Sequence, residues 1–192
     1  MNGMLIVLCG SSGAGKGKVF EEISRRRSNV RKVLSVTSRP HRADDPKEPN
    51  YVFVSEREFK AMIARGEFYE WIVYDGHLYG TLNIPAEELT ETDLFFDKDI
   101  VGALRIKKQY PETITIYIMP KDVDTLLKRR GDRGTDRQKI GIDEIEPAKQ
   151  LDFLVINDNI EDTVDQVENI IECMRKNGMK NKRNLKFLDE FY

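Results

Sequence analysis

The sequence predicts an α/β protein with three layers, in which helices cover both faces of a five-stranded parallel sheet. Five short apolar runs have the length of buried strands, and most of the segments between them have the spacing of amphipathic helices. Strands and helices that alternate in this way form parallel sheets, because each helix carries the chain back to the edge where the next strand begins. The five runs are Leu5–Cys9, Val33–Val36, Leu94–Asp97, Ile114–Met119 and Phe153–Ile156.

The composition is that of a globular protein and limits its partners. With 192 residues, of which 40% are apolar and 33% charged, the chain can bury one sizeable core and carry a small inserted subdomain. A formal net charge of −2 gives no electrostatic reason to expect nucleic acid or a membrane surface as a partner. The two cysteines, Cys9 and Cys173, do not suggest a disulfide framework, since Cys9 lies in an expected buried strand. Residues 1–4 carry no basic segment, and no apolar run approaches the length of a membrane span, so we expect a cytoplasmic protein.

A glycine-rich turn follows the first strand and precedes a helical pattern at Val19–Ile23. Three glycines let the backbone curl so that successive amide hydrogens point inward, and Lys16 with the start of the helix adds positive potential. This arrangement predicts a loop that binds the terminal phosphates of a nucleotide such as ATP. The alternative, a strand-to-helix turn with an incidental lysine, is disfavoured by the glycines and flanks together. The residues expected to bind ATP are Gly10, Ser11, Ser12, Gly13, Ala14, Gly15, Lys16, Gly17 and Lys18.

Lys18 departs from the usual chemistry of such a loop. The usual pattern ends in a serine or threonine whose hydroxyl helps to hold Mg²⁺, directly after the lysine or one residue later. Here Gly17 follows Lys16, and the next residue is Lys18. An ammonium group has donors and no lone pair, so it cannot ligate a metal. Phosphate binding is expected to be intact, no protein ligand for a metal is assigned, and the role of Mg²⁺ stays open.

The stretch 37–88 interrupts the alternation of strands and helices and predicts an inserted mixed α/β subdomain. Asp75-Gly76 is a hairpin signal. Ser55–Glu58 has the pattern of a capping box, which opens a helix over Phe59–Arg65 that Gly66 ends. The aromatic and β-branched runs expected to form strands here are Tyr51–Val54, Tyr69–Tyr74 and Leu78–Gly80.

Further along, a polar, arginine-rich segment at about 129–146 predicts a second, shorter insertion. A closing helix is expected at about Glu161–Lys176, with an apolar face, followed by a basic tail at 179–192. The chain is therefore expected to be one domain, with its core formed by residues 1–36, 89–128 and 147–178.

A second candidate site lies where the chain leaves the second expected strand. Ser35–Arg42 places two guanidinium groups and three hydroxyls in one loop, and arginine suits phosphate oxygens because it can donate two hydrogen bonds at once. By itself this pattern is equally compatible with a solvated arginine-rich loop.

Taken together, the motifs resemble those of the guanylate kinase family over nearly the whole chain. Each match is short, but they follow one another in the order that the family shows. Besides the glycine-rich loop, the matching segments are Ser35–Arg42, Tyr51–Val54, Phe68–Glu70, Tyr79–Thr81, Asp99–Ala103, Arg133–Thr135 and Ile156–Asp158.

The resemblance implies transfer of a phosphoryl group from ATP, bound with Mg²⁺, to GMP, with 37–88 as the GMP-binding subdomain. It implies that the GMP phosphate is held by Arg39, Arg42, Tyr51 and Tyr79, and that guanine is recognised by Ser35, Glu70 and Thr81, with Gly80 and Asp99 also at this site. It implies that the segment at about 129–146 is a short lid. It also implies catalytic roles for Lys16, Arg39 and Arg130, and places Arg133 and Asn157 near the adenine of ATP. Asp99 could equally be the N-cap of the following helix.

Several positions depart from the family pattern. Besides Lys18, the loop 44–50 lacks the family's glycines, and Asp143 stands near the position of a third lid arginine. Two hypotheses from different classes therefore stay open: an ATP:GMP phosphotransferase with normal or altered metal dependence, and a degenerate domain that binds a guanine nucleotide or a protein without turnover. A kinase of another nucleotide is a third, against which Ser35 and Glu70 both argue.

Overall fold

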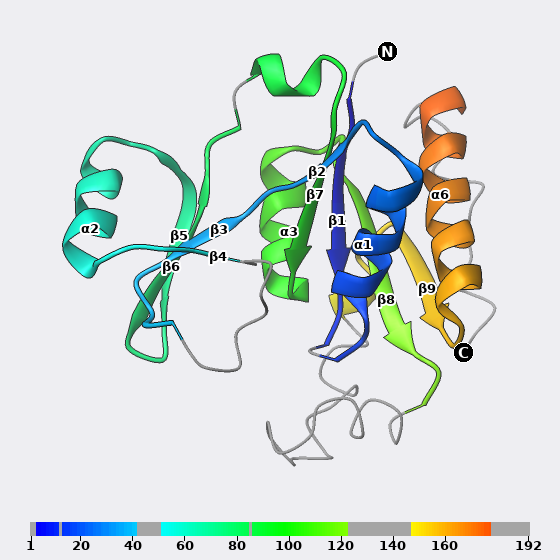
Figure 1. Cartoon of the computed structure of the whole chain (residues 1–192), viewed down its shortest axis with the longest axis horizontal. Helices are drawn as coiled ribbons and strands as arrows, with labels where there is room; N and C mark the ends of the chain where they lie inside the picture. The colour runs from blue at the N-terminus through cyan, green and yellow to red at the C-terminus, as the bar shows by residue number, and fades with distance from the viewer. Residues whose placement is uncertain (1–2, 12, 42–50, 85, 123–146, 178–192) are drawn as a thin grey trace. The chain divides into compact units, whose positions relative to one another are not determined.

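The computed structural model describes residues 3–11, 13–41, 51–84, 86–122 and 147–177 (Figure 1). Contacts divide the chain into two compact units. The smaller unit comprises residues 33–91, and the larger comprises residues 2–32 and 92–192. The expected lid and the basic tail lie outside the described residues. Within the described part, no helix has the length and apolar character needed to cross a membrane.

The larger unit has a five-stranded parallel sheet with the strand order β2-β7-β1-β8-β9. Its helices cover both faces, since α1 packs on α6 at one face while α3 contacts β1, β7 and β8 at the other (Figure 1). The prediction of a three-layer α/β fold with a parallel sheet is confirmed. The strands are β1 (Leu5–Cys9), β2 (Val30–Lys32), β7 (Asp93–Lys98), β8 (Ile114–Pro120) and β9 (Phe153–Asn157), and the helices are α1 (Lys16–Arg26), α3 (Ile100–Gln109) and α6 (Ile160–Asn177).

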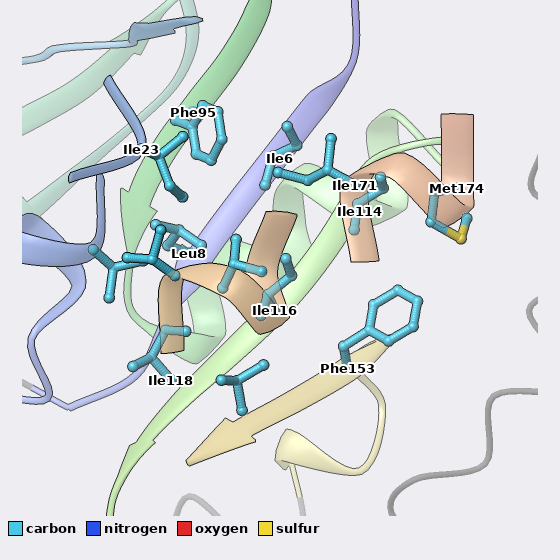
Figure 2. Packing of buried hydrophobic residues seen from close by; sticks show 14 of the residues in the cluster. Ile6, Leu8, Ile23, Phe95, Ile114, Ile116, Ile118, Phe153, Ile171 and Met174 are labelled. Carbon is cyan, nitrogen blue, oxygen red and sulfur yellow. The ribbon is translucent and has the colours of Figure 1, made fainter. Parts of the chain in front are cut away.

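The core of this unit lies between the sheet and the helices α1 and α6 (Figure 2). Ile6 and Leu8 of β1 and alternate isoleucines of β8 are almost completely buried there, because successive side chains of a strand point to opposite faces. Ile23 of α1 and Ile171 of α6 pack on this layer. The strand β1 is therefore fixed in the middle of the sheet, and the glycine-rich segment leaves its carboxyl end.

The prediction of a core strand at Val33–Val36 is wrong. The core sheet uses β2, Val30–Lys32, at its edge, and the chain then crosses into the smaller unit, where Ser35–Thr37 forms β3. The valines at 33 and 36 are buried, which explains the apolar signal. β2 has the sequence Val-Arg-Lys and pairs only with β7 at the sheet edge, and so short a segment with two charged residues gave no strand signal.

The smaller unit has a mixed four-stranded sheet with the order β4-β3-β6-β5, in which β3 and β4 are parallel and the other pairs antiparallel. One face of the sheet packs on α2 through Val36, Leu78, Phe59 and Met62. The elements are β3 (Ser35–Thr37), β4 (Tyr51–Phe53), α2 (Glu56–Ala64), β5 (Phe68–Tyr74), β6 (His77–Leu82) and the 3₁₀ helix η1 (Ala86–Leu89).

The cap and turn signals in this unit are confirmed, but α2 begins at Glu56, directly after its cap, and not at the expected Phe59. Ser55 is the N-cap of α2, and its hydroxyl accepts a hydrogen bond from the amide of Glu58 at 3.1 Å. Gly66 follows the helix with φ +70°, and Asp75 and Gly76 turn the β5–β6 hairpin with φ values of 50° and 73°.

Candidate functional site

The glycine-rich segment forms a tight loop between β1 and α1. Gly10, Gly13 and Gly15 have φ values of 139°, 87° and 100°, in the region that residues with side chains rarely adopt. At Gly10 a Cβ atom would also lie 2.3 Å from the carbonyl oxygen of Ile118, so a side chain is excluded there by space as well. The amide of Ala14 donates to the carbonyl oxygen of Ser11 at 3.1 Å, which closes the turn.

Lys16 is held at the mouth of this loop by three acceptors. Its ammonium donates to the carbonyl oxygens of Gly10 at 2.7 Å and Ser11 at 3.3 Å, and lies 3.6 Å from a carboxylate oxygen of Asp97. The same carboxylate lies 3.4 Å from the ammonium of Lys32. Sequence reasoning assigned no role to Asp97 or Lys32. One sequence feature could have suggested a role for Asp97, since it lies at the carboxyl end of an expected strand, where ligands bind in parallel sheets.

The helix α1 begins at Lys16, with Gly15 as its N-cap, and its first turn carries no acidic residue. The amide hydrogens of a first turn have no partner within the helix, and the helix dipole adds positive potential, so this end attracts anions. Gly17 and Lys18 are exposed in the first turn. The described loop therefore has the backbone and charge that a nucleotide's terminal phosphates require.

Asp99 is the N-cap of α3, and one of its carboxylate oxygens accepts a hydrogen bond from the amide of Gly102 at 2.7 Å. The prediction of an N-cap is confirmed. The role near a nucleotide that the resemblance implies for Asp99 stays a prediction.

Asn157 lies at the end of β9 and contacts the glycine-rich loop at residues 10–18, which is called the phosphate loop below. Its side-chain amide donates to the carbonyl oxygen of Ala14 at 2.7 Å, and the residue is 4% exposed. The hydroxyl of Thr163 lies 3.2 Å from the side-chain oxygen of Asn157. No signal in the sequence pointed to this contact, since the two partners are separated by 143 positions in the chain.

In the smaller unit, strand register gathers the residues expected to recognise guanine. Ser35 of β3 pairs with Thr81 of β6, and Thr81 pairs with Glu70 of β5. The hydroxyl of Thr81 donates to a carboxylate oxygen of Glu70 at 3.4 Å. Tyr51 of β4 pairs with Ser35 on its other side, so four predicted site residues form one row across the sheet.

The residues expected to hold a phosphate lie beside this row. Tyr79 is two residues before Thr81 and hence on the same face, and its ring lies 5.9 Å from that of Tyr51. The guanidinium of Arg39 lies 5.8 Å from the ring of Tyr51 and 5.1 Å from that of Phe53, and donates to the carbonyl oxygen of Pro40 at 2.9 Å. Arg39 is only 6% exposed, so its position is fixed by its neighbours.

Gly80 lies against aromatic side chains of the smaller unit's core. A Cβ atom there would lie 2.5 Å from the ring of Phe68 and 3.0 Å from that of Phe59, and these two rings stack with centroids 4.4 Å apart. Gly80 therefore makes room for the core under α2. Its proposed place at the GMP site stays a prediction. Four further predicted site residues lie outside the described residues: Ser12, Arg42, Arg130 and Arg133.

Comparisons with known proteins identify relatives of this chain. The family model for guanylate kinase matches residues 2–174. The chain is 37% identical over 191 residues to guanylate kinase of Thermotoga maritima, with 95% of this chain and 92% of the relative covered. It is 35% identical over 178 residues to guanylate kinase of Carboxydothermus hydrogenoformans, with 88% and 87% covered. The crystal structure of guanylate kinase from Anaplasma phagocytophilum matches with a TM-score of 0.72 and 26% identity, covering 95% of this chain and 89% of that one. On its fold, its phosphate loop and these similarities, the chain belongs to the guanylate kinase family.

Proposed function

We propose that this chain transfers the γ-phosphoryl group of ATP to GMP and forms ADP and GDP. The proposal rests on the family and on one observation. The chain combines a glycine-rich loop, whose carbonyl oxygens accept hydrogen bonds from Lys16, and the carboxylate of Glu70, which pairs across the smaller sheet with Thr81, itself paired with Ser35. A domain that binds only GMP would not need the first of these features.

The reaction needs positioning and charge neutralisation rather than covalent catalysis. A phosphate oxygen of GMP attacks the γ-phosphorus of ATP, while the bond from that phosphorus to the oxygen bridging it to the β-phosphate breaks and ADP leaves. Lys16 and the amide hydrogens at the start of α1 neutralise charge on the ATP phosphates. Arg39, Tyr51 and Tyr79 hold the GMP phosphate, and Arg42 and Arg130 add positive charge.

Glu70 selects guanine. Its carboxylate accepts hydrogen bonds from the N1 and N2 hydrogens of guanine, and the hydroxyl of Thr81 holds it from the side. Adenine presents an acceptor at N1 and no amino group at position 2. AMP would therefore leave the carboxylate desolvated with fewer hydrogen bonds than GMP gives it, which costs about 1–3 kcal/mol or more for a charged group.

The residues beside the loop fit an ATP-bound Mg²⁺ ion. Mg²⁺ in nucleotide sites is held by phosphate oxygens, waters and one or two carboxylates, and does not need a cage of protein ligands. Asp97 and Asp99 supply carboxylate oxygens at the carboxyl end of β7, whereas Lys18 cannot act as a ligand. When bound, the ion would neutralise phosphate charge and orient the γ-phosphoryl group.

The test is an assay for ADP formation with ATP, GMP and Mg²⁺, coupled to an indicator reaction. We expect turnover that requires GMP, falls strongly when AMP replaces GMP, and is lost in Lys16→Ala. Binding of GMP measured by calorimetry, without ADP formation, would instead show that the chain keeps the pocket and lacks the reaction.

A further inference from the structure

We infer that Asn157 and Thr163 form a clamp that fixes the backbone of the phosphate loop, and that Asn157 acts on ATP through this loop rather than through the adenine base. The Asn157–Thr163 clamp consists of these two side chains and the carbonyl group of Ala14. The inference concerns the ATP side of the proposed reaction, and its main test measures binding, so it does not depend on turnover.

The clamp contacts the loop at its most constrained point. Ala14 lies between Gly13 and Gly15, whose φ values are both positive, and its amide already donates to Ser11. The hydrogen bond from Asn157 to the carbonyl oxygen of Ala14 fixes the peptide group that leads into Gly15, the N-cap of α1. The orientation of the amide hydrogens that follow, which would face the phosphates, depends on this peptide group.

Thr163 in turn fixes the orientation of the Asn157 side chain. Its hydroxyl lies 2.6 Å from the carbonyl oxygen of Asn159 and 3.2 Å from the side-chain oxygen of Asn157, so its one hydrogen is shared between two acceptors. Because the oxygen of Asn157 faces this donor, its NH₂ group must face Ala14. The reverse orientation would place two oxygens against each other at Ala14.

Burial makes the clamp specific to the loop. Ala14 and Thr163 are 0% exposed and Asn157 is 4% exposed, so water cannot replace a lost partner without rearrangement. The side-chain oxygen of Asn157 and one of its amide hydrogens are occupied within the protein. A residue in this position transmits its effect to phosphate binding, whatever base the nucleotide carries.

The experiment compares two probes that differ only in the nucleoside. Calorimetry measures the dissociation constants of ATP and of inorganic tripolyphosphate, which has the phosphates and no base. The variants are Asn157→Leu, which removes the donor at similar size, and the pair Thr163→Val and Thr163→Ser, of which only serine keeps the hydroxyl. Thr115→Val is the matched control, because Thr115 is also buried and bonded through its hydroxyl, to Asp152, away from the loop. Lys16→Ala gives the reference for a loss at the loop itself.

We expect Asn157→Leu and Thr163→Val to raise the dissociation constants of both probes by a similar factor of about ten. Thr163→Ser should restore most of the affinity, and Thr115→Val should lower the melting temperature without changing either dissociation constant. Weaker binding of ATP with unchanged binding of tripolyphosphate would assign Asn157 to the base and overturn the inference. Unchanged binding of both probes in Thr163→Val would overturn it as well, and this variant keeps the test decisive if Asn157→Leu does not fold. Wild-type protein that binds both probes but forms no ADP would refute the proposed function alone.

Discussion

Lys18 gives this chain an ammonium group where metal-assisted phosphoryl transfer usually has a hydroxyl. It is exposed in the first turn of α1, two residues after Lys16. A cation at the start of a helix is opposed by the helix dipole, and its side chain is long enough to approach a phosphate bound there. We infer that Lys18 supplies part of the charge neutralisation that Mg²⁺ provides elsewhere.

Replacing Lys18 by threonine should therefore make turnover more dependent on Mg²⁺. In Lys18→Thr we expect ADP formation at low Mg²⁺ concentration to fall several-fold, because the ammonium no longer neutralises phosphate charge, while turnover at saturating Mg²⁺ is kept or increased. Lys18→Met is the control, since it removes the charge without offering a ligand and should lose activity at every concentration of Mg²⁺. Identical Mg²⁺ profiles in the wild type and both variants would show that Lys18 is only a solvated side chain.

The sequence predicted the local geometry of the candidate site where the neighbours are close in the chain, and it did not predict contacts between residues that are distant in the chain. Glycines at positions 10, 13 and 15 indicate a phosphate loop because each can adopt the positive φ angle that the loop requires. Ser35, Glu70 and Thr81 were predicted only through the family resemblance, and strand register then places them in one row. The contacts of Asp97 with Lys16 and Lys32, and of Asn157 with Ala14, depend on packing between strands and could not be deduced from local pattern.

The helices α1 and α6 are joined by charged side chains above their shared apolar core. Arg26 of α1 contacts Asp165 at 2.5 Å and Glu168 at 3.1 Å, and Arg27, the C-cap of α1, contacts Glu172. The hydrogen bond from Arg27, and the positive charges of Arg27, Arg175 and Lys176, hold the pKa of the Glu172 carboxyl below its ordinary value. These contacts fasten α6, which carries Thr163, to the helix that follows the phosphate loop.

This pKa shift predicts how the contribution of Glu172 depends on pH. Because the folded state lowers the pKa, Glu172 stabilises the fold above the unfolded-state pKa of about 4.3, and this stabilisation is lost as the pH falls through the lower folded-state value. Glu172→Gln should lower the free energy of unfolding by less than about 1 kcal/mol at pH 7, since the pair is partly exposed, and by nothing once the carboxyl is protonated. Urea unfolding across this pH range measures the difference. An equal deficit at all pH values would mean that packing, not charge, is responsible, and a double-mutant cycle with Arg27→Gln separates the two.

The boundaries of strands were harder to predict than their existence. The valines at 33 and 36 are both buried, but the strand that contains Val36 pairs with β4 and β6 rather than with the core. A strand that is buried in either sheet has the same apolar sequence pattern, so only the strand pairing shows to which sheet it belongs. By contrast, Ser55, Gly66 and Asp75-Gly76 were predicted correctly, because caps and turns depend on a few adjacent residues.

Each of the two units has its own apolar core, and each carries one group of the proposed binding residues. The phosphate loop, Asp97 and Asn157 belong to the larger unit, and the row that contains Ser35, Thr81 and Glu70 belongs to the smaller one. A ligand that binds one group should stabilise mainly the unit that carries it, since stabilisation by binding acts on the structure that binds.

Hydrogen exchange can separate these effects. We expect GMP alone to slow exchange mainly in β3, β5 and β6, and ADP alone to slow it mainly at residues 10–20 and in the first turn of α6. Exchange measured by mass spectrometry on short peptides resolves the two regions, and Lys16→Ala and Glu70→Gln should each abolish one pattern while keeping the other. Protection of the smaller unit by ADP alone would contradict this division of roles.

The hydrogen bond between Asn157 and Ala14 also has a consequence for the order of events during synthesis. The carbonyl oxygen of Ala14 in the loop accepts a hydrogen bond from Asn157, which the ribosome adds 143 residues later. At about 5–20 residues per second, roughly 7–30 s pass between translation of the two partners. During most of that interval the nascent chain contains the glycines of the loop and Lys16 but lacks β9 and α6. It should therefore bind ATP weakly until nearly all of the fold has been made, so that the nucleotide meets a complete enzyme rather than an isolated loop.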